Sequence, residues 1–217
     1  MEKIVILGAG GLAREALMVI KQANRGTATS RREILGFIDE NPKNHGRLLN
    51  GYPILGDFDW FSTIDTTNTK AVCAIGNNEA RKKVTKKADN IGIEFTNVIH
   101  PNAQISDSVK LGKGIIVCAG NIITCNIEIG NHVYINLDCT IGHDAILENY
   151  VNLSPGVHVS GNCKLLEGSH IFTGAVIAPG ITIGKWSILG AGAVLLEDIP
   201  DYVVAVGVPA KVIKPRK

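Results

Sequence analysis

The sequence predicts a two-part protein, a small α/β domain followed by a long parallel β-helix. Strand-like and helix-like patterns alternate over roughly the first hundred residues. After that, aliphatic residues recur at every sixth position, and Gly, Asn or Asp recur three residues after them in the sequence. A period of six matches neither the 3.6-residue period of an amphipathic helix nor the two-residue period of a plain strand. We therefore expect two domains, at residues 1–100 and 101–217.

The composition describes a globular chain without a strong charge. Its 217 residues include 22 Lys and Arg against 20 Asp and Glu, a formal net charge of +2, and 45% of them are hydrophobic. This balance gives no electrostatic reason to expect nucleic acid or an anionic membrane as a partner. The N-terminal run MEKIVILGAGG indicates a buried strand rather than a secretion signal, and no apolar segment approaches membrane-spanning length. We expect a soluble, cytoplasmic protein that does not insert into membranes.

The five cysteines form no CxxC pair and no zinc-ligand spacing. Without a secretion signal, free thiols are the expected state, and no metal is expected. The histidines other than His143 are expected at surface or edge positions.

In the first part, alternating patterns predict a small Rossmann-like parallel sheet. We expect strands over residues 4–7, up to Asp39, over 71–75 and over 95–99, with helices over 12–21 and from Asn78. Gly8, Gly10 and Ala13 fit G-x-G-x-x-A, in which a helix N-terminus receives phosphates. The motif alone is weak and also fits NAD. About 100 residues are only half of a full dinucleotide fold, however, so a single nucleotide is favoured.

One charged run also lies in this part. RKKVTKK, residues 81–87, is interpreted as the solvated face of a helix.

The second part is built on its six-residue repeat. From Ile105 to Leu195 every sixth residue is Ile, Leu or Val, and the residue four places later is small or apolar, which assigns Cys139 and Cys163 to the core. An inward aliphatic residue, a turn and a short strand in each hexad predict a parallel β-helix of about five coils, three hexads to a coil. A third column holds residue types that tolerate positive φ. It includes Gly114, Gly120, Asn126, Asp138, Asp144, Gly156, Asn162, Gly168, Gly174, Gly180, Gly192 and Asp198.

His143 stands at the third position of its hexad, directly before the turn residue Asp144. A side chain there is expected to project outward at an edge of the prism. Gly161 takes the same position one coil later, about 4.8 Å away by strand spacing, and leaves room and a backbone N–H beside the imidazole. From the repeat alone, an ordinary exposed turn and a catalytic pair are both open interpretations.

Several segments resemble the left-handed β-helix acetyltransferases, in particular the sialic acid O-acetyltransferase and nucleotide-aminosugar N-acetyltransferase group. They are IGHD (141–144), SPGVHVSGN (154–162), VGVPAKVIK (206–214), GFIDENP (36–42) and AIGNNEARKKV (74–84). The resemblance implies a left-handed helix, acetyl-CoA as co-substrate, and a homotrimer with active sites between neighbouring prisms. It also implies that His143 is the general base, that Asp144 supports it, and that Gly161 donates its N–H to the thioester carbonyl.

The same resemblance assigns the binding residues. The glycine loop would take the phosphates, Asp39 the base or ribose, and residues 76–78 the sugar. The group often has a second histidine where this chain has Asn152. The substrate-binding residues it implies are Gly8, Gly10, Gly11, Asp39, Gly76, Asn77, Asn78 and Asn136, and the coenzyme A-binding residues are Asn152, Gly161, Ala191, Pro209 and Lys211.

The function predicted from these features is acetyl transfer from acetyl-CoA to the 4-amino group of a nucleotide-linked 4-amino-4,6-dideoxy sugar, carried on UDP or dTDP, for bacterial glycan synthesis. A sugar or sialic acid O-acetyltransferase is the alternative within the group. A non-catalytic scaffold and a small NAD-binding regulator are alternatives of other classes.

Overall fold

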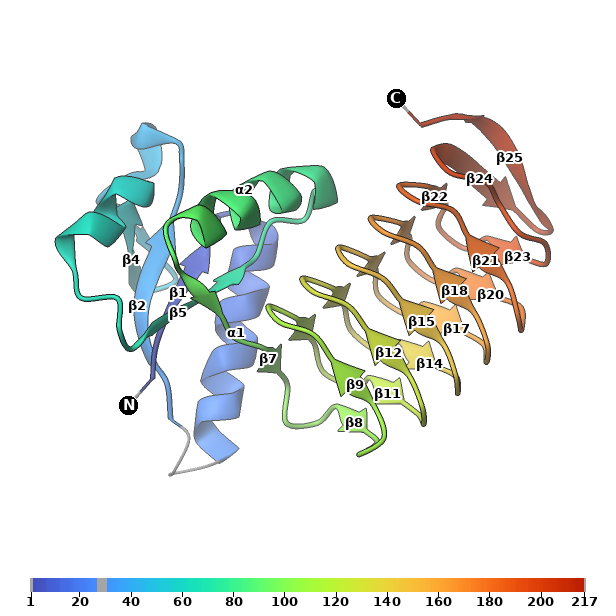
Figure 1. The fold of residues 1–217 in the computed structure, drawn as a ribbon, viewed down its shortest axis with the longest axis horizontal. Coiled ribbons are helices and arrows are strands. Elements are labelled where there is room, and N and C mark those ends of the chain that lie inside the picture. The colour runs from blue at the N-terminus through green and yellow to red at the C-terminus, as the bar shows by residue number, and fades with distance from the viewer. Residues whose placement is uncertain (1, 27–30, 217) are drawn as a thin grey trace. The chain divides into compact units, whose positions relative to one another are not determined.

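The computed structural model describes residues 2–26 and 31–216. The chain divides into two compact units, Met1–Pro101 and Asn102–Lys217, and Figure 1 shows their elements. The sequence places this division between residues 100 and 101. Among the described residues, no helix is long and apolar enough to cross a membrane.

The first unit holds a six-stranded sheet in the order β3-β4-β2-β1-β5-β6. All neighbouring pairs are parallel except β3 and β4, which form an antiparallel hairpin. The elements are β1 (Lys3–Leu7), α1 (Gly11–Gly26), β2 (Glu33–Ile38), η1 (Pro42–Asn44), β3 (Leu48–Leu49), β4 (Tyr52–Gly56), η2 (Phe58–Thr63), β5 (Thr69–Cys73), α2 (Asn78–Asn90), β6 (Glu94–Phe95) and β7 (Val98–Ile99).

The predicted parallel sheet is confirmed for β1, β2 and β5, and the sequence analysis missed the hairpin at its edge. Asn50 and Gly51 join the two hairpin strands with φ angles of 49° and 86°, the left-handed pair that a two-residue hairpin turn requires. The strand expected over 95–99 is wrong as one element, because it is two short strands, β6 and β7. Helix α1 is also longer than the expected 12–21.

Helix α1 buries one stripe of apolar side chains against the sheet. Ala13, Ala16, Leu17 and Ile20 follow the i, i+3, i+4, i+7 spacing of an amphipathic helix, and each is at most 1% exposed. Residues 4–7 of β1 are fully buried. This packing fixes the glycine loop between β1 and α1.

Helix α2 carries the charged run 81–87, which is only partly the solvated face expected from the sequence. Arg81 and Thr85 are buried on the inner side of the helix. The Arg81 Nη1 donates to the Ile75 carbonyl oxygen at 2.9 Å. The Thr85 Oγ1 donates to the Lys82 carbonyl oxygen of its own helix at 3.2 Å. The expectation is therefore wrong at these two positions, because both side chains are buried and hydrogen-bonded inside the unit.

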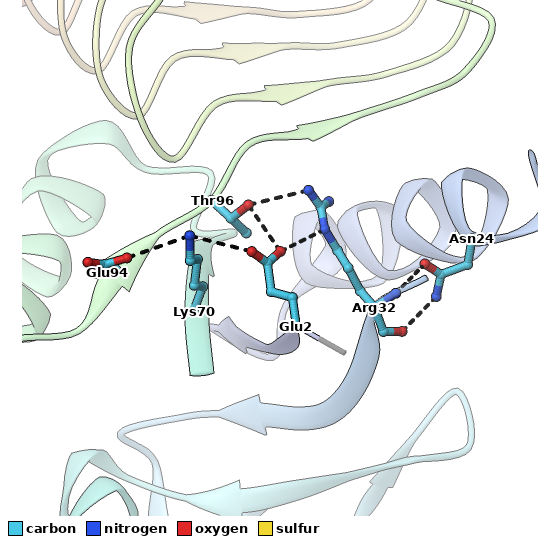
Figure 2. Close-up of polar contacts among 6 residues, drawn as sticks. All are labelled: Glu2, Asn24, Arg32, Lys70, Glu94 and Thr96. Carbon is cyan, nitrogen blue, oxygen red and sulfur yellow. Dashed lines mark hydrogen bonds and ion pairs between the residues drawn. The ribbon is translucent and has the colours of Figure 1, made fainter. Parts of the chain in front are cut away.

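A polar network ties together the N-terminal ends of the parallel strands (Figure 2). Glu2 accepts from the Arg32 Nε at 2.9 Å and lies 3.5 Å from the Lys70 Nζ, which also contacts Glu94 at 3.6 Å. Asn24 of α1 exchanges two hydrogen bonds with the Arg32 backbone. Because these contacts lie at the strand beginnings, they leave the opposite, carboxyl-terminal edge of the sheet free for a ligand.

The second unit is a three-faced β-helix, and Figure 1 shows its stacked coils from β8 to β23. Face 1 contains β10 (Ile116–Val117), β13 (Tyr134–Ile135), β16 (Asn152–Leu153), β19 (His170–Ile171) and β22 (Ile188–Leu189). Face 2 contains β8 (Gln104–Ile105), β11 (Ile122–Ile123), β14 (Thr140–Ile141), β17 (His158–Val159), β20 (Val176–Ile177) and β23 (Val194–Leu195). Face 3 contains β9 (Lys110–Leu111), β12 (Glu128–Ile129), β15 (Ile146–Leu147), β18 (Lys164–Leu165) and β21 (Thr182–Ile183).

The repeat predicted from the sequence is confirmed strand by strand. Each strand on a face pairs in parallel with the strand 18 residues later, as Ile141 does with Val159. The aliphatic column and the small column both face inward, and Cys139 and Cys163 are fully buried. The turn column takes positive φ as predicted, with Asp144 at 59°. Asp198 is the exception: it has no positive φ, and its Oδ1 accepts from the Thr182 N–H where the chain leaves the repeat.

Aromatic side chains occupy turn positions at the edge between faces 3 and 1. His132, Tyr150 and Trp186 have φ between 55° and 63°, and each is at most 8% exposed. The His132 and Tyr150 rings stack with centroids 5.4 Å apart. His132 therefore lies at an edge of the prism, as expected, but ring stacking between coils buries its side chain.

The β-helix ends in an antiparallel hairpin. β24 (Val203–Gly207) extends face 1 by pairing with β22, and β25 (Ala210–Pro215) pairs with β24. Arg216 donates to the carbonyl oxygen of Trp186 at 2.7 Å. This bond attaches the end of the hairpin to the edge between faces 3 and 1, which we call the aromatic edge after His132, Tyr150 and Trp186.

Candidate active site

His143 and Asp144 form a hydrogen-bonded pair at the edge where the chain passes from face 2 to face 3, which we call the histidine edge. The His143 Nδ1 lies 2.7 Å from the Asp144 Oδ2. Backbone hydrogen bonds hold both residues between coils: the Asp144 N–H donates to the Cys125 carbonyl at 3.1 Å, and the Asn162 N–H donates to the His143 carbonyl at 2.8 Å. The pair is thus presented from a rigid corner while its side chains remain about half exposed, at 58% and 47%.

The hydrogen bond of the pair determines which ring nitrogen of His143 can accept a proton. The hydrogen bond from His143 holds the pKa of the Asp144 carboxyl below its usual value, a second hydrogen bond from the Asn126 side chain lowers it further, and slight burial opposes both. Asp144 is therefore ionised at neutral pH, and its Oδ2 accepts a hydrogen bond from the Nδ1–H of His143. With that proton on Nδ1, the lone pair of a neutral imidazole lies on Nε2, the atom that can take a proton from a substrate.

Gly161 lies directly against this imidazole. A Cβ added to Gly161 would come within 2.6 Å of the His143 Nε2 and 2.7 Å of its Cε1. Only a residue without a side chain leaves His143 in its present position. The structure therefore brings together three of the predicted residues, namely His143, Asp144 and Gly161.

Lys211 belongs to the same edge through its ion pair. Its Nζ lies 3.2 Å from the Glu197 Oε2, and Glu197 occupies the position of His143 three coils later. At about 4.8 Å per coil, this places Glu197 about 14 Å along the edge from His143. Pro209 lies between β24 and β25, in the same hairpin as Lys211, after a cis peptide bond.

The remaining predicted residues of this unit lie elsewhere on the prism. Asn136 and Ala191 follow β13 and β22, so both lie at the edge between faces 1 and 2. The Asn136 Oδ1 accepts from the Leu137 N–H at 2.8 Å. Asn152 lies within β16 on face 1 and is 2% exposed. Within one chain, the structure does not bring these three residues to His143.

The first unit has a cavity of about 580 Å³ at the carboxyl-terminal ends of its strands. The glycine loop 8–11, Asp39 and Gly76 contribute to its lining, as predicted from the sequence. A Cβ on Gly8 would meet the Ile75 side chain at 2.9 Å, whereas a Cβ on Gly10 would meet nothing within 4 Å. Gly10 therefore faces open space, and helix α1 begins one residue later with no acidic side chain in its first turn. Such a helix start suits phosphate groups.

Asp39 is held by its own loop. Its Oδ1 accepts from the Asn41 N–H at 2.9 Å and from the Asn44 side chain at 3.1 Å, and His45 bonds its carbonyl oxygen at 2.7 Å. These bonds fix the carboxylate at the end of β2. The second oxygen, Oδ2, is the atom available to a ribose or base.

Asn77 and Asn78 have structural roles in the described residues. The Asn77 Oδ1 caps helix α2 by accepting from the Ala80 N–H at 2.8 Å. Asn78 is 1% exposed. The sequence analysis missed Glu40 and Phe58, which also line the cavity. Phe58 follows a helix-capping aspartate, Asp57, and no periodic pattern marks it.

Comparisons with known proteins agree with both parts of the chain. The model of the PglD N-terminal domain matches residues 3–88. GDP-perosamine N-acetyltransferase of Escherichia coli O157:H7 is 28% identical over 215 residues, covering 96% of this chain and 95% of that protein. A mutant perosamine N-acetyltransferase from Caulobacter crescentus, solved with CoA and GDP-perosamine, superposes with a TM-score of 0.90 at 32% identity, covering 99% and 98% of the two chains. The acetyltransferase domain of PglB from Neisseria gonorrhoeae FA1090, solved with acetyl coenzyme A, gives 0.88 at 33% identity, covering 98% and 99%.

The chain belongs to the hexapeptide-repeat nucleotide-aminosugar N-acetyltransferases. Its β-helix is left-handed, as in these structural neighbours. Like them, it is an acetyl-CoA-dependent sugar N-acetyltransferase whose acceptor is a nucleotide-linked aminosugar. In the described residues, no group of three or more His, Cys, Asp or Glu side chains is placed to hold a metal ion.

Proposed function

We propose that this N-acetyltransferase acylates the 4-amino group of a nucleotide-linked 4-amino-4,6-dideoxy sugar, with His143 as general base. The observation that carries this proposal is the 2.7 Å contact from His143 to Asp144 with Gly161 against the Nε2. Two structures of the C. crescentus relative with CoA and GDP-perosamine carry a substituted histidine, one to Asn and one to Ala. In that relative a histidine can therefore be replaced while both ligands still bind, which is compatible with a histidine that acts in the chemical step.

The reaction follows from the geometry of the pair. The sugar amine attacks the thioester carbonyl carbon of acetyl-CoA, and the His143 Nε2 takes the proton that the amine nitrogen loses. Asp144 holds the opposite ring nitrogen and stabilises the imidazolium that forms. The backbone N–H of Gly161 is the donor for the developing oxyanion. The C–S bond then breaks, and coenzyme A leaves with the proton from the imidazolium.

The histidine edge provides a track for coenzyme A. Lys211 marks one end, three coils from His143, and supplies a cation for the phosphate groups. The thioester end then reaches the imidazole along the edge. Ala191 and Pro209 are further candidates for contacts with the pantetheine chain.

A homotrimer with active sites between neighbouring prisms is part of the proposal. Asn136, Asn152 and Ala191 lie on other faces or edges than His143. In an assembly that places the edge between faces 1 and 2 of one prism against the histidine edge of the next, Asn136 and Ala191 would border the cleft, whereas the Asn152 side chain is already covered within its own chain.

The nucleotide is proposed to bind in the cavity of the first unit. The Gly8–Gly11 loop and the start of α1 receive the diphosphate, Asp39 contacts the ribose or base, and Gly76 borders the sugar. UDP and dTDP are the carriers expected from the sequence. GDP joins them because the relatives named above act on GDP-perosamine.

The test is an acetyl-CoA assay against UDP-, dTDP- and GDP-linked 4-amino-4,6-dideoxy sugars, each beside its 4-hydroxy counterpart. A neutral amine is the stronger nucleophile, so we expect kcat/KM for the aminosugar to exceed that for the hydroxy sugar by about a hundredfold or more. Equal rates, or acetylation of free sialic acid alone, would assign the enzyme to O-acetyl transfer.

A further inference from the structure

The charged side chains that line the nucleotide cavity have the wrong sign for their proposed ligand. Asp39 and Glu40 contribute carboxylates, and among the cavity-lining residues that the structure describes there is no Lys or Arg. A nucleoside diphosphate sugar brings about two further negative charges. Like charges repel across a half-open cavity, so the cavity needs a compensating cation nearby.

Lys87 is a cation in the required place, although it does not itself line the cavity. Its Nζ lies 2.7 Å from the Glu40 Oε1 and 4.6 Å from the centroid of the Phe58 ring. Glu40 follows β2, Phe58 begins η2, and Lys87 lies in the last turn of α2, so one ammonium group joins three elements around the cavity. The run of residues 81–87 thus contains one exposed lysine with a defined position.

The Phe58 ring explains why Lys87 stays beside Glu40. Phe58 is 6% exposed and packed into the core of the unit, so it offers a fixed aromatic face. A cation over such a face is attracted to the ring electrons. The ion pair itself is half exposed, with side chains at 51% and 53%, and exposed ion pairs contribute little to folding stability. Stability alone therefore does not account for this arrangement.

We propose that Lys87 neutralises Glu40 at the rim of the cavity and thereby determines the affinity of the enzyme for the diphosphate part of its substrate. This inference rests on the proposed nucleotide site. Lys87 then sets the affinity for the diphosphate through its charge and takes no part in the chemistry at His143.

A helix-terminal role is the competing explanation, because a cation in the last turn of a helix is favourable wherever it points. Lys86→Gln controls for the loss of one positive charge on this helix, and the double variant Glu40→Gln/Lys87→Gln tests the helix-terminal explanation. Lys86 lies one residue earlier on α2, is exposed, and loses the same charge when changed to Gln. Lys86→Gln is therefore the matched control for Lys87→Gln.

The experiment is calorimetric titration of the full chain with UDP, dTDP and GDP, followed by the nucleoside of whichever diphosphate binds most tightly. In about 50 mM salt we expect Lys87→Gln to weaken diphosphate binding about three- to tenfold, and we expect about 500 mM salt to reduce that difference. Binding of the uncharged nucleoside and of coenzyme A stays at the wild-type level. Lys86→Gln binds all ligands as the wild type does.

The double variant Glu40→Gln/Lys87→Gln decides the mechanism. Removing the carboxylate removes the need for a cation, so diphosphate affinity returns to within about twofold of the wild type. The proposal is overturned if the double variant stays as weak as Lys87→Gln, if Lys86→Gln loses as much affinity, or if the nucleoside is weakened equally. If the wild type binds coenzyme A but none of the three diphosphates, the proposed nucleotide site itself fails. Equal diphosphate affinities for the wild type and Lys87→Gln refute the role of Lys87 alone.

Discussion

Replacing Gly161 by Ala tests whether the position of the His143 imidazole governs catalysis. The φ angle of Gly161 lies outside the left-handed region, so the backbone accepts Ala without strain. The new Cβ would lie 2.6 Å from the His143 Nε2, whereas non-bonded heavy atoms need about 3.5 Å. The imidazole must therefore move by about 1 Å, away from the position that aligns its Nδ1 with Asp144. Misplacing a reacting group by that distance lowers the rate about a hundredfold, or about 2.7 kcal/mol in transition-state stabilisation.

The measurement is kcat with acetyl-CoA and the preferred aminosugar at saturation, together with the melting temperature. The displaced atoms are at the end of a flexible side chain, so we expect a melting temperature within a few degrees of the wild type and an unchanged affinity for the nucleotide. A wild-type kcat would refute the assignment of His143 as the base, because the imidazole cannot keep its position beside a methyl group that overlaps it. A fall in melting temperature matching the fall in kcat would show a folding defect instead.

Three further outcomes follow from individual residues. His143→Ala should lower kcat about 10²–10⁴-fold. Size-exclusion chromatography should still show the wild-type assembly, since the side chain is 58% exposed, and a kcat near the wild type would place the base elsewhere. In the folded protein an aromatic disulfide reagent should modify the exposed Cys125 and leave Cys73 intact, because burial raises the pKa of the Cys73 thiol to about 12. Rapid reaction of both thiols would contradict the packing of β5. In chemical unfolding, Gly168→Ala should lower the free energy of unfolding by about 1–3 kcal/mol more than Gly174→Ala. Both glycines have φ of 68–69°, but only a Cβ on Gly168 would overlap the indole ring of Trp186 in the next coil. Equal losses would show that the edge between faces 3 and 1 is loosely packed.

The β-helix was predictable from the sequence because each hexad repeats the same physical demands. An inward position accepts an aliphatic residue or a small one, and the turn position accepts a residue that tolerates positive φ. A residue that departs from this pattern is therefore noticeable only where its side chain is chemically reactive, as at His143. The aromatic residues in the turn column were not predictable in this way. At these left-handed positions the Tyr150 ring stacks on His132 and the Trp186 ring covers Gly168 of the preceding coil, and no rule based on single residues contains such contacts.

The cavity proposed to bind the nucleotide was predictable only in its backbone loops. Glycine spacing and a strand-end carboxylate mark the loop at Gly8 and the position of Asp39. The rim depends on contacts between residues far apart in sequence, such as Glu40 with Lys87 and Lys87 with Phe58. These contacts depend on how α2 and η2 pack against the sheet. The sequence therefore shows the charged run but not which of its lysines lies beside Glu40 at the rim of the cavity.

The position of the proposed catalytic pair follows from which positions of the hexad the core and the turns do not require. Inward columns are occupied by the core, and the strand residues that face outward are constrained by neighbours along each face. The third position of a hexad, at an edge, carries the least structural demand, so it can change to Gly at 161 or His at 143 without harm to the coil. Asp144 is different, because its φ of 59° also serves the turn. A carboxylate there satisfies the fold and the imidazole together, so the turn and the catalytic interpretation of this residue do not compete.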